Sequence, residues 1–447
     1  MTTAAAPTIF ALASAPGRAG VAVVRVSGSR VLAALTALGI DDIPPLRTAC
    51  LRKLRDGSGG AVIDHALVVR FAAPASFTGE DVAELHLHGG KAVIDGVLAA
   101  LAHVDGLRMA EPGEFTRRAF ENGKLDLTAA EAVADLIAAE TEAQRLQALD
   151  QLGGGLARLY TGWSDTLAKI VAHVEADIEF PDEDLPEGIS AALRDDIVAL
   201  RNDIDGHLAD ARRGERLRDG LQVAIIGAPN AGKSSLLNAL AARDAAIVSD
   251  IAGTTRDVIE VPMDLGGYPV VLSDTAGLRD TGDVIEAEGI RRAARRAEDA
   301  DIKLALFDHA TAPDAPTLAH VDARTIVVLT KDDGGRADTQ ALALPPHHAT
   351  VRASTKTANG LQDLLRVLTT AVGGFFGMRE RPMPTRERHR AALADARLHL
   401  ERALSAPLPE LVAEDLRLSL RAIGGITGRV HVEDLLDRIF RDFCIGK

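Results

Sequence analysis

Residues 227–234 read GAPNAGKS, a complete G-x-x-x-x-G-K-[ST] phosphate loop. The loop directly follows the apolar run VAIIG and precedes the helical pattern SLLNALAAR, which is the strand–loop–helix order that such a loop requires. Backbone N–H groups between Gly227 and Gly232 can wrap phosphate oxygens. Lys233 can neutralise the β and γ oxygens, and Ser234 can bind magnesium at a helix N-terminus. The stretch therefore predicts a nucleoside triphosphate site in an α/β domain.

Two further segments complete the phosphate and metal side of this site. Asp274 ends the strand pattern VVLSD, where its carboxylate can hold the water shell of magnesium, and the N–H of Gly277 can meet the γ-phosphate. The segment IAGTTRD lies between the two motifs. Its Thr255 hydroxyl can reach the metal, while Thr254 and Arg256 lie on a stretch that the γ-phosphate would order.

The sequence TKDD at 330–333 predicts that the base is guanine. It follows the apolar strand TIVVL, and Asp333 can accept two N–H bonds that adenine cannot donate. Two such bonds at about 1.5–3 kcal/mol each disfavour ATP by roughly two to four orders of magnitude. ASTK follows downstream, with Ser354 to Lys356 expected to supply a backbone contact to the base. This motif order is that of a complete GTPase.

The residue after Gly277 is Leu278, where many GTPases carry a glutamine that orients the attacking water. Leucine cannot form a hydrogen bond with its side chain, so another group must replace the glutamine. Arg256 could act within the chain, or a monovalent cation could bind the Asn230 amide oxygen and the carbonyls of residues 249–254. Water orientation could pass to Glu286 or Glu288. The residues alone leave these alternatives open.

Composition limits the class of protein. The chain has 447 residues, so a GTPase module of about 160 leaves room for two further units. No apolar stretch is long enough to span a bilayer, no cleavable signal pattern is present, and Cys50 and Cys444 form no disulfide framework. These features favour a cytoplasmic protein. The formal net charge of −14 argues against broad adhesion to nucleic acid, so any RNA contact must be local.

The pattern predicts a multidomain chain that combines α/β and all-α domains. Residues 1–118 alternate short apolar runs with helical ones, which predicts an N-terminal α/β domain. Residues 119–216 and 380–447 show helical periodicity and flank a Ras-like P-loop GTPase domain at 217–379. The GTPase therefore looks inserted into a discontinuous helical domain. Thr128 and Glu131 have the spacing of a capping box at the start of the first helical part.

The whole chain resembles the tRNA-modification GTPases of the MnmE/TrmE family, within the TrmE-, Era-, EngA-, YihA- and septin-like GTPases. Besides GAPNAGKS, IAGTTRD and DTAGLR, the resemblance rests on APGRAGVAVVRVSG, SFTGEDVAELHLHGG, EPGEFTRRAFENGKLDL, IEFPDEDLP and the terminal FCIGK. It implies a homodimer formed through the N-terminal domain. It also implies a complex with a flavin-containing partner of the MnmG/GidA type, a heterotetramer or larger. Such complexes add an aminomethyl or carboxymethylaminomethyl group to carbon 5 of wobble uridines in certain tRNAs, using GTP and a tetrahydrofolate one-carbon unit.

The resemblance also implies roles for individual residues. Folate, as 5-formyl- or 5,10-methylene-tetrahydrofolate, would contact Arg25, Glu84, Lys124 and Lys447, with Cys444 near the one-carbon chemistry. Potassium would bind Asn230, Ser249, Ile251 and Thr254, and Glu286 would position the water beside the catalytic Lys233 and Thr255. Magnesium would bind Ser234 and Thr255, with Asp274 acting through water. The full set expected to contact GTP is Asn230, Ala231, Gly232, Lys233, Ser234, Ser235, Ser249, Asp250, Ile251, Ala252, Gly253, Thr254, Thr255, Asp274, Thr275, Ala276, Gly277, Thr330, Lys331, Asp333, Ser354, Thr355 and Lys356.

One departure from the family pattern affects the base loop. Thr330 stands where asparagine is usual, and the sequence predicts the loss of an amide that braces the base loop against the phosphate loop. Two other functions are compatible with the motifs. One is a GTP-dependent binding switch in ribosome or complex assembly, and the other is a folate-binding scaffold with a vestigial GTPase.

Overall fold

The computed structural model describes residues 6–57, 60–179, 191–242, 247, 260–274, 295–331, 344–357, 360–377, 381–430, 433–441 and 443–446. The chain forms two compact units. One comprises residues 1–134, 152–165 and 421–447, and the other comprises residues 135–151 and 166–420. The predicted domain boundaries at residues 118, 216 and 379 stay a prediction.

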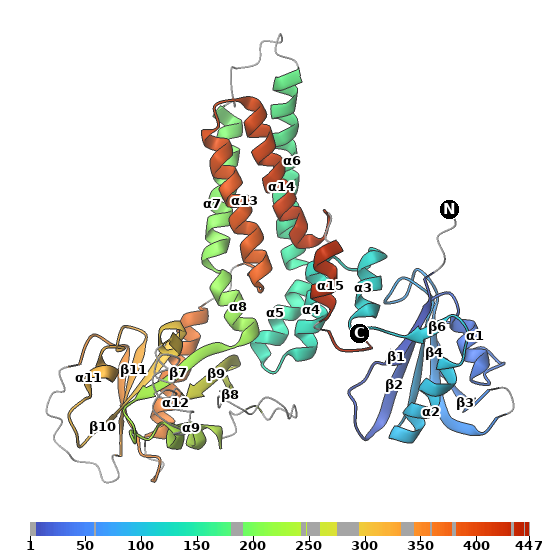
Figure 1. Ribbon diagram of the computed structural model, residues 1–447, viewed down its shortest axis with the longest axis horizontal. Coiled ribbons are helices and arrows are strands. Elements are labelled where there is room, and N and C mark those ends of the chain that lie inside the picture. The colour runs from blue at the N-terminus through green and yellow to red at the C-terminus, as the bar shows by residue number, and fades with distance from the viewer. Residues whose placement is uncertain are drawn as a thin grey trace, which may run out of the picture. The chain divides into compact units, whose positions relative to one another are not determined.

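The first unit is built on a mixed sheet with the strand order β3-β4-β5-β2-β1-β6 (Figure 1). Helices α1 (Val31–Ala37) and α2 (Lys91–Ala102) bury their apolar sides against one face of this sheet, around residues such as Val24 and Leu85. The predicted α/β domain is therefore confirmed. The strands are β1 (Thr8–Leu12), β2 (Ala19–Ser27), β3 (Cys50–Arg55), β4 (Val62–Phe71), β5 (Val82–Gly89) and β6 (Leu107–Met109).

The opposite face of the sheet carries an exposed apolar row. Leu51 pairs with Leu67, Leu67 with His86, and His86 with Val23, so the four side chains lie in register across β3, β4, β5 and β2. Leu51 is 62% exposed and Leu67 is 46% exposed.

The C-terminal helix α15 (Glu433–Arg441) belongs to the same unit and packs with α3 (Glu114–Glu121) and the start of α4 (Leu127–Ala138). A small core joins Leu127, Phe440 and Phe443. After α15 the chain runs beside residues 112–113, where the N–H of Gly113 donates to the carbonyl of Cys444 at 3.3 Å. The C-terminal residues are thereby held against the N-terminal sheet domain.

The N-terminus of α4 differs from the predicted capping box. Asp126 is the capping residue, because its Oδ1 accepts the backbone N–H groups of Thr128 at 2.8 Å and Ala129 at 3.0 Å. Thr128 and Glu131 lie inside the helix, and both are buried. The expectation of a Thr128–Glu131 cap was wrong because the helix begins at Leu127, so that Asp126 caps the N–H groups of its first turn and Thr128 lies inside it.

The second unit contains a helical bundle, which Figure 1 shows as long helices running together. Interhelical hydrogen bonds and ion pairs join neighbours: Arg417 with Glu175, His399 with Asp415, and Arg194 with the carbonyl of Leu404. The helices of the predicted first and second parts therefore pack against each other. Their bounds are α5 (Glu142–Leu152), α6 (Gly155–Glu179), α7 (Ala191–Ala209), α8 (Ala211–Asp219), α13 (Glu387–Ser405) and α14 (Pro409–Thr427).

A second sheet is inserted between these helices, with the order β12-β11-β10-β7-β9-β8. All its neighbouring strands run parallel except β8 and β9, which form an antiparallel hairpin. α8 ends at Asp219 and β7 begins at Leu221, which confirms the predicted insertion. The elements are β7 (Leu221–Gly227), α9 (Lys233–Ala241), β8 (Glu260–Leu265), β9 (Tyr268–Asp274), β10 (Ile302–Asp308), α11 (Ala315–Leu318), β11 (Thr325–Thr330), β12 (Ala349–Arg352) and α12 (Leu361–Phe376).

The turn of the β8–β9 hairpin contacts the helices. Gly266 and Gly267 form this turn with φ values of 66° and 87°, a conformation that favours glycine. The carbonyl of Gly267 accepts the N–H of Ala143 in the first turn of α5 at 3.0 Å. The ring of Tyr268 stacks on Phe376 of α12, with centroids 4.7 Å apart.

Among the described residues, no helix is both long and apolar enough to cross a lipid bilayer.

Candidate functional site

The phosphate loop is held open by its glycines. Gly232 immediately precedes α9 with φ 96°, and Asn230 has φ 63°, so the loop turns its backbone through the left-handed region twice. A Cβ on Gly227 would lie 2.8 Å from the carbonyl oxygen of Leu306 in the neighbouring strand. The loop lies at the carboxyl end of β7, between β10 and β9, which is where open α/β sheets bind ligands.

Lys233 is the buried cation of this loop. Its ammonium donates to the carbonyls of Gly227 at 2.8 Å and Ala228 at 2.9 Å, and the residue is only 8% exposed. Burial lowers the pKa of Lys233, although Asp274 and Asp314 oppose this effect. A triphosphate would add negative charge beside the ammonium and stabilise its charged form.

Ser234 and Asp274 come together from α9 and β9. The Ser234 hydroxyl donates to Oδ2 of Asp274 at 2.7 Å, and Asp274 is almost fully buried. A hydroxyl and a carboxylate at this separation are oxygen donors of the kind that Mg²⁺ takes, together with water and phosphate oxygens. These two residues therefore fit the predicted magnesium site.

The base end of the site is built from the carboxyl ends of β10 and β11. Thr330 is buried, and its hydroxyl donates to the carbonyl of Ala231 in the phosphate loop at 2.9 Å. The predicted loss of bracing was therefore wrong, because the threonine hydroxyl joins the two loops. Ser354 lies after β12, and its Oγ accepts the N–H groups of Lys356 and Thr357, both at 3.2 Å, which closes the ASTK turn around Thr355.

Several predicted residues lie outside the described part of the chain, so the structure does not place them. They are Ser249, Asp250, Ile251, Ala252, Gly253, Thr254, Thr255, Arg256, Thr275, Ala276, Gly277, Leu278, Glu286, Glu288, Asp333 and Lys447.

The predicted folate residues Arg25 and Glu84 form an ion pair across β2 and β5. Nη2 and Nε of Arg25 lie 2.9 and 3.1 Å from Oε1 of Glu84. The guanidinium also lies over the rings of Phe77 at 5.4 Å and Phe115 at 5.7 Å. Sequence reasoning missed these two rings, although Phe77 lies in the quoted segment SFTGEDVAELHLHGG.

Lys124 and the C-terminal residues approach the same region of the first unit. The Lys124 ammonium donates to the carbonyl of Pro74 at 3.0 Å, in the loop that also carries Phe77. Cys444 is a free, exposed cysteine, and the next residue, Ile445, forms a bridge with Pro112. A planar ring system with an anionic tail fits the combination of aromatic rings and cations here.

The two histidines of β5 have acidic neighbours. His86 Nε2 lies 3.3 Å from Glu84, and His88 Nδ1 lies 2.7 Å from the buried Asp64. Burial makes the largest single contribution and raises the pKa of Asp64. The hydrogen bonds with His88 and His65 together exceed it, so the pKa of Asp64 lies below its usual value. Within the described residues, no three His, Cys, Asp or Glu side chains are arranged to hold a metal ion.

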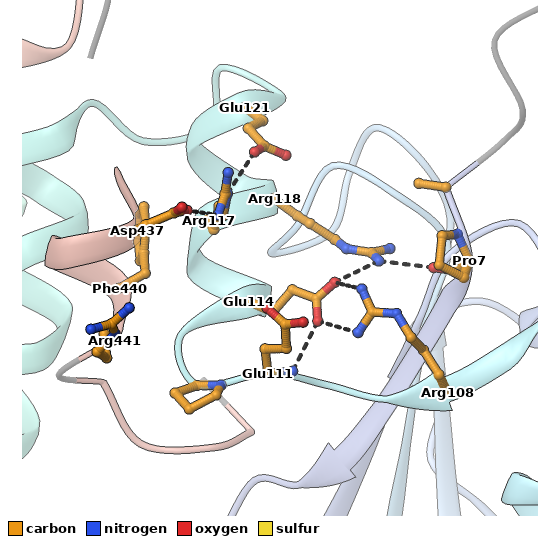
Figure 2. A pocket seen from close by; sticks show the side chains of 12 residues that line it. Pro7, Arg108, Glu111, Glu114, Arg117, Arg118, Glu121, Asp437, Phe440 and Arg441 are labelled. Atoms are coloured by element: carbon orange, nitrogen blue, oxygen red, sulfur yellow. Dashed lines mark hydrogen bonds and ion pairs between the residues drawn. The ribbon is translucent and has the colours of Figure 1, made fainter. Parts of the chain in front are cut away.

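A cavity of about 490 Å³ lies between α3 and α15. Figure 2 shows its charged lining, in which Glu114 accepts hydrogen bonds from Arg108 and Arg118, and Arg117 bridges Glu121 and Asp437. The bonds from Arg108 and Arg118 lower the pKa of Glu114, although burial is the largest contribution and opposes them. Most of these charges are paired within the protein, and the Arg117–Asp437 pair ties α15 to α3.

Comparisons with known proteins cover nearly all of the chain. The family model described as the MnmE helical domain matches residues 127–444, and that described as the GTP-binding protein TrmE N-terminus matches residues 8–124. A curated protein from Rhodospirillum rubrum, "tRNA modification GTPase MnmE", is 56% identical over 98% of this chain and 99% of its own length. A protein of the same name from Paramagnetospirillum magneticum is 54% identical over 98% of this chain and 99% of its own length.

Among solved structures, the G domain of the T. maritima FeoB iron transporter matches at 24% identity. The match covers 34% of this chain and 98% of the FeoB G-domain chain. Its TM-score is 0.26, which is too low to support an argument.

Proposed function

The chain belongs to the MnmE family of tRNA modification GTPases, and on that basis we propose that it hydrolyses GTP in the course of modifying tRNA. The observation that carries the proposal is the arrangement of Lys233, Ser234 and Asp274 around an open phosphate loop. In this arrangement the Lys233 ammonium neutralises phosphate charge. Ser234 would bind Mg²⁺ directly and Asp274 would hold it through water, and the metal would supply positive charge that polarises the phosphate oxygens.

The finer proposal concerns the tRNA product. With a flavin-containing partner of the MnmG type, the protein adds an aminomethyl or carboxymethylaminomethyl group to carbon 5 of wobble uridine. It takes the one-carbon unit from tetrahydrofolate bound by Arg25, Glu84, Lys124 and Lys447. The Arg25–Glu84 pair between two aromatic rings supports a pterin site. Nucleoside mass spectrometry of tRNA from cells lacking this chain tests the proposal, and unchanged wobble uridines would contradict it.

The folate residues have a separate test that does not depend on activity. Arg25→Gln removes the charge that holds Glu84 and lies over both rings, so we expect 5-formyl-tetrahydrofolate to bind at least tenfold more weakly. Arg52→Gln is the matched control, because Arg52 also forms an ion pair on this sheet, with Asp42 at 2.7 Å. Equal folate affinity in the two variants would refute this site.

We propose that GTP hydrolysis depends on potassium. The Leu278 side chain cannot form a hydrogen bond with water, and Asn230, whose φ is 63°, supplies an amide side chain within the phosphate loop. Ser249, Ile251 and Thr254 would complete the cation site, and Glu286 would position the water. GTP turnover measured in potassium and in sodium buffers should differ, and Asn230→Ala should remove the difference. Equal wild-type rates in the two salts would exclude a potassium site.

A homodimer through the N-terminal domain is the third part of the proposal. The exposed side chains of Leu51 and Leu67, which are paired on neighbouring strands, support it, because exposed apolar side chains that lie together can mark an interface. Light scattering after gel filtration should give a dimer for the wild type and a monomer for Leu51→Asp. Leu408→Asp is the control, since Leu408 is 55% exposed but lies between α13 and α14. A dimeric Leu51→Asp variant would place the interface elsewhere.

A further inference from the structure

The segment Asp308–Ala310, which begins with the last residue of β10, lies against the start of the base loop. The N–H of His309 donates to the carbonyl of Thr330 at 3.2 Å, and His309 Nδ1 lies 3.1 Å from the same oxygen. One residue later, the Lys331 ammonium donates to Oδ2 of Asp308 at 2.9 Å. The end of β10 therefore holds two consecutive residues of the TKDD motif. None of the sequence motifs includes Asp308.

Lys331 has an unusual backbone conformation. Its φ is 63°, in the left-handed region that side-chain-bearing residues rarely adopt. Such a conformation persists only where surrounding contacts fix it, and those contacts often lie at ligand sites. The contacts of Lys331 include the ion pair with Asp308 and the hydrogen bonds that His309 forms with Thr330.

Asp308 is the fixed partner of this pair. Its second oxygen, Oδ1, accepts the N–H of Ala310 at 3.0 Å, and its side chain is only 20% exposed. The side chain of Lys331 is 50% exposed. The hydrogen bond from Lys331 is the main reason that the pKa of Asp308 lies below its usual value. The carboxylate is thus held by its own turn and restrains the more exposed lysine.

We propose that Asp308 is a positioning residue for guanine recognition, because its ion pair fixes Lys331, the second residue of the TKDD motif. The inference rests on the proposed GTP-binding function. Holding the lysine in place before the base arrives removes part of the entropy cost of ordering it on binding. The effect concerns the base and not the phosphates, because Lys233 and Ser234 lie on a separate loop.

The test variant is Asp308→Asn. The asparagine oxygen can still accept the N–H of Ala310, so the turn is kept and only the ion pair is lost. The matched control is Asp322→Asn, since Asp322 also accepts from a lysine, Lys303, at 2.9 Å. That pair lies at the opposite end of β10 and β11, far from the base loop. Lys331→Met removes the pair from the other side and leaves Asp308 unchanged.

Two probes separate the base from the phosphates. Calorimetry with Mg²⁺ and GDP should give a Kd about five- to tenfold higher for Asp308→Asn than for the wild type. Inorganic tripolyphosphate with Mg²⁺ should bind both equally. Asp322→Asn should bind both probes as the wild type does. Asp308→Asn should add little to the effect of Lys331→Met in the double variant, because both remove one interaction.

The possible outcomes distinguish the proposed GTP-binding function from the positioning role of Asp308. Failure of the wild type to bind GDP would sink the proposed function. A wild type that binds GDP together with an Asp308→Asn variant of equal affinity would overturn only the positioning role. An equal loss of GDP and tripolyphosphate binding would also overturn it, since a general structural defect affects both probes. Should Asp308→Asn not fold, Lys331→Met must lower GDP affinity selectively, or the inference fails.

Discussion

Replacing Thr330 by valine tests how the base loop and the phosphate loop are joined. Valine has nearly the shape of threonine, so the change removes the hydroxyl that donates to the carbonyl of Ala231 at 2.9 Å and little else. Both residues are at least 94% buried, so water cannot easily replace the lost donor. Thr330→Ser keeps a hydroxyl and is the matched control.

The expected effect falls mainly on stability. Leaving a buried carbonyl without its donor costs about 1–3 kcal/mol. For a domain of this size, each kcal/mol corresponds to roughly 2–4 °C in melting temperature. We therefore expect Thr330→Val to lower the melting temperature by about 2–12 °C. The bond joins two parts of the protein and stabilises the domain with or without nucleotide, so GTP affinity should fall by less than about tenfold.

Differential scanning fluorimetry and titration of a fluorescent GTP analogue measure the two quantities on the same sample. A GTP affinity reduced by far more than tenfold at an unchanged melting temperature would refute this reasoning. It would mean that the hydroxyl acts on the nucleotide and not on the loops. Thr330→Ser should stay close to the wild type in both measurements.

Three further predictions follow from contacts in the structure. Burial, with smaller effects of His389 and Arg381, lowers the pKa of His207 from 6.5 to about 4, so the unfolded chain binds the proton first on acidification. The contribution of His207 to the free energy of unfolding should be complete above about pH 6.5 and should fall by up to roughly 3 kcal/mol as the pH drops to 4. Melting curves of His207→Asn should show a weaker loss of stability over the same pH range. The double variant Glu142→Cys with Gly267→Cys should form a disulfide on oxidation, because the two Cβ atoms would lie 3.8 Å apart. Neither single variant should form this cross-link. If mass spectrometry of the oxidised double variant shows no disulfide, the contact between α5 and the hairpin turn is contradicted. Asp126→Ala should cost about 0.5–2 kcal/mol in chemical denaturation, and an unchanged midpoint would argue against its capping role.

The meeting of Lys233, Ser234, Asp274 and Thr330 at one edge of the sheet was predictable because it depends on local spacing. GAPNAGKS, the end of VVLSD and TKDD each follow an apolar strand, and parallel strands bring their carboxyl ends to one edge. The contact between Thr330 and Ala231 was not predictable, since it depends on how close two loops 99 residues apart in sequence approach each other. The shorter side chain of threonine suggested that the contact with the phosphate loop was lost, but the Thr330 hydroxyl reaches the carbonyl of Ala231.

The sequence pattern did not indicate strand β3 or the aromatic partners of Arg25. Strand β3 reads CLRKLR, in which the charged residues interrupt the alternation that marks a half-buried strand. It lies at the sheet edge, where Leu51 and Lys53 both face outward and only Leu54 enters the core. The partners of Arg25 were also hidden, because Phe77 and Phe115 come from two separate segments that meet only in the folded chain.

The β8–β9 hairpin connects Asp274 of the predicted magnesium site with helix α5. Its strands are hydrogen-bonded along their length, with Asp274 at one end and the turn at Gly267 at the other. Seven residues of strand span roughly 20 Å, and paired strands resist bending far more than a loop does. A continuous hydrogen-bonded ladder therefore joins Asp274 to the turn that contacts the first turn of α5, and it is the direct covalent and hydrogen-bonded route between the two.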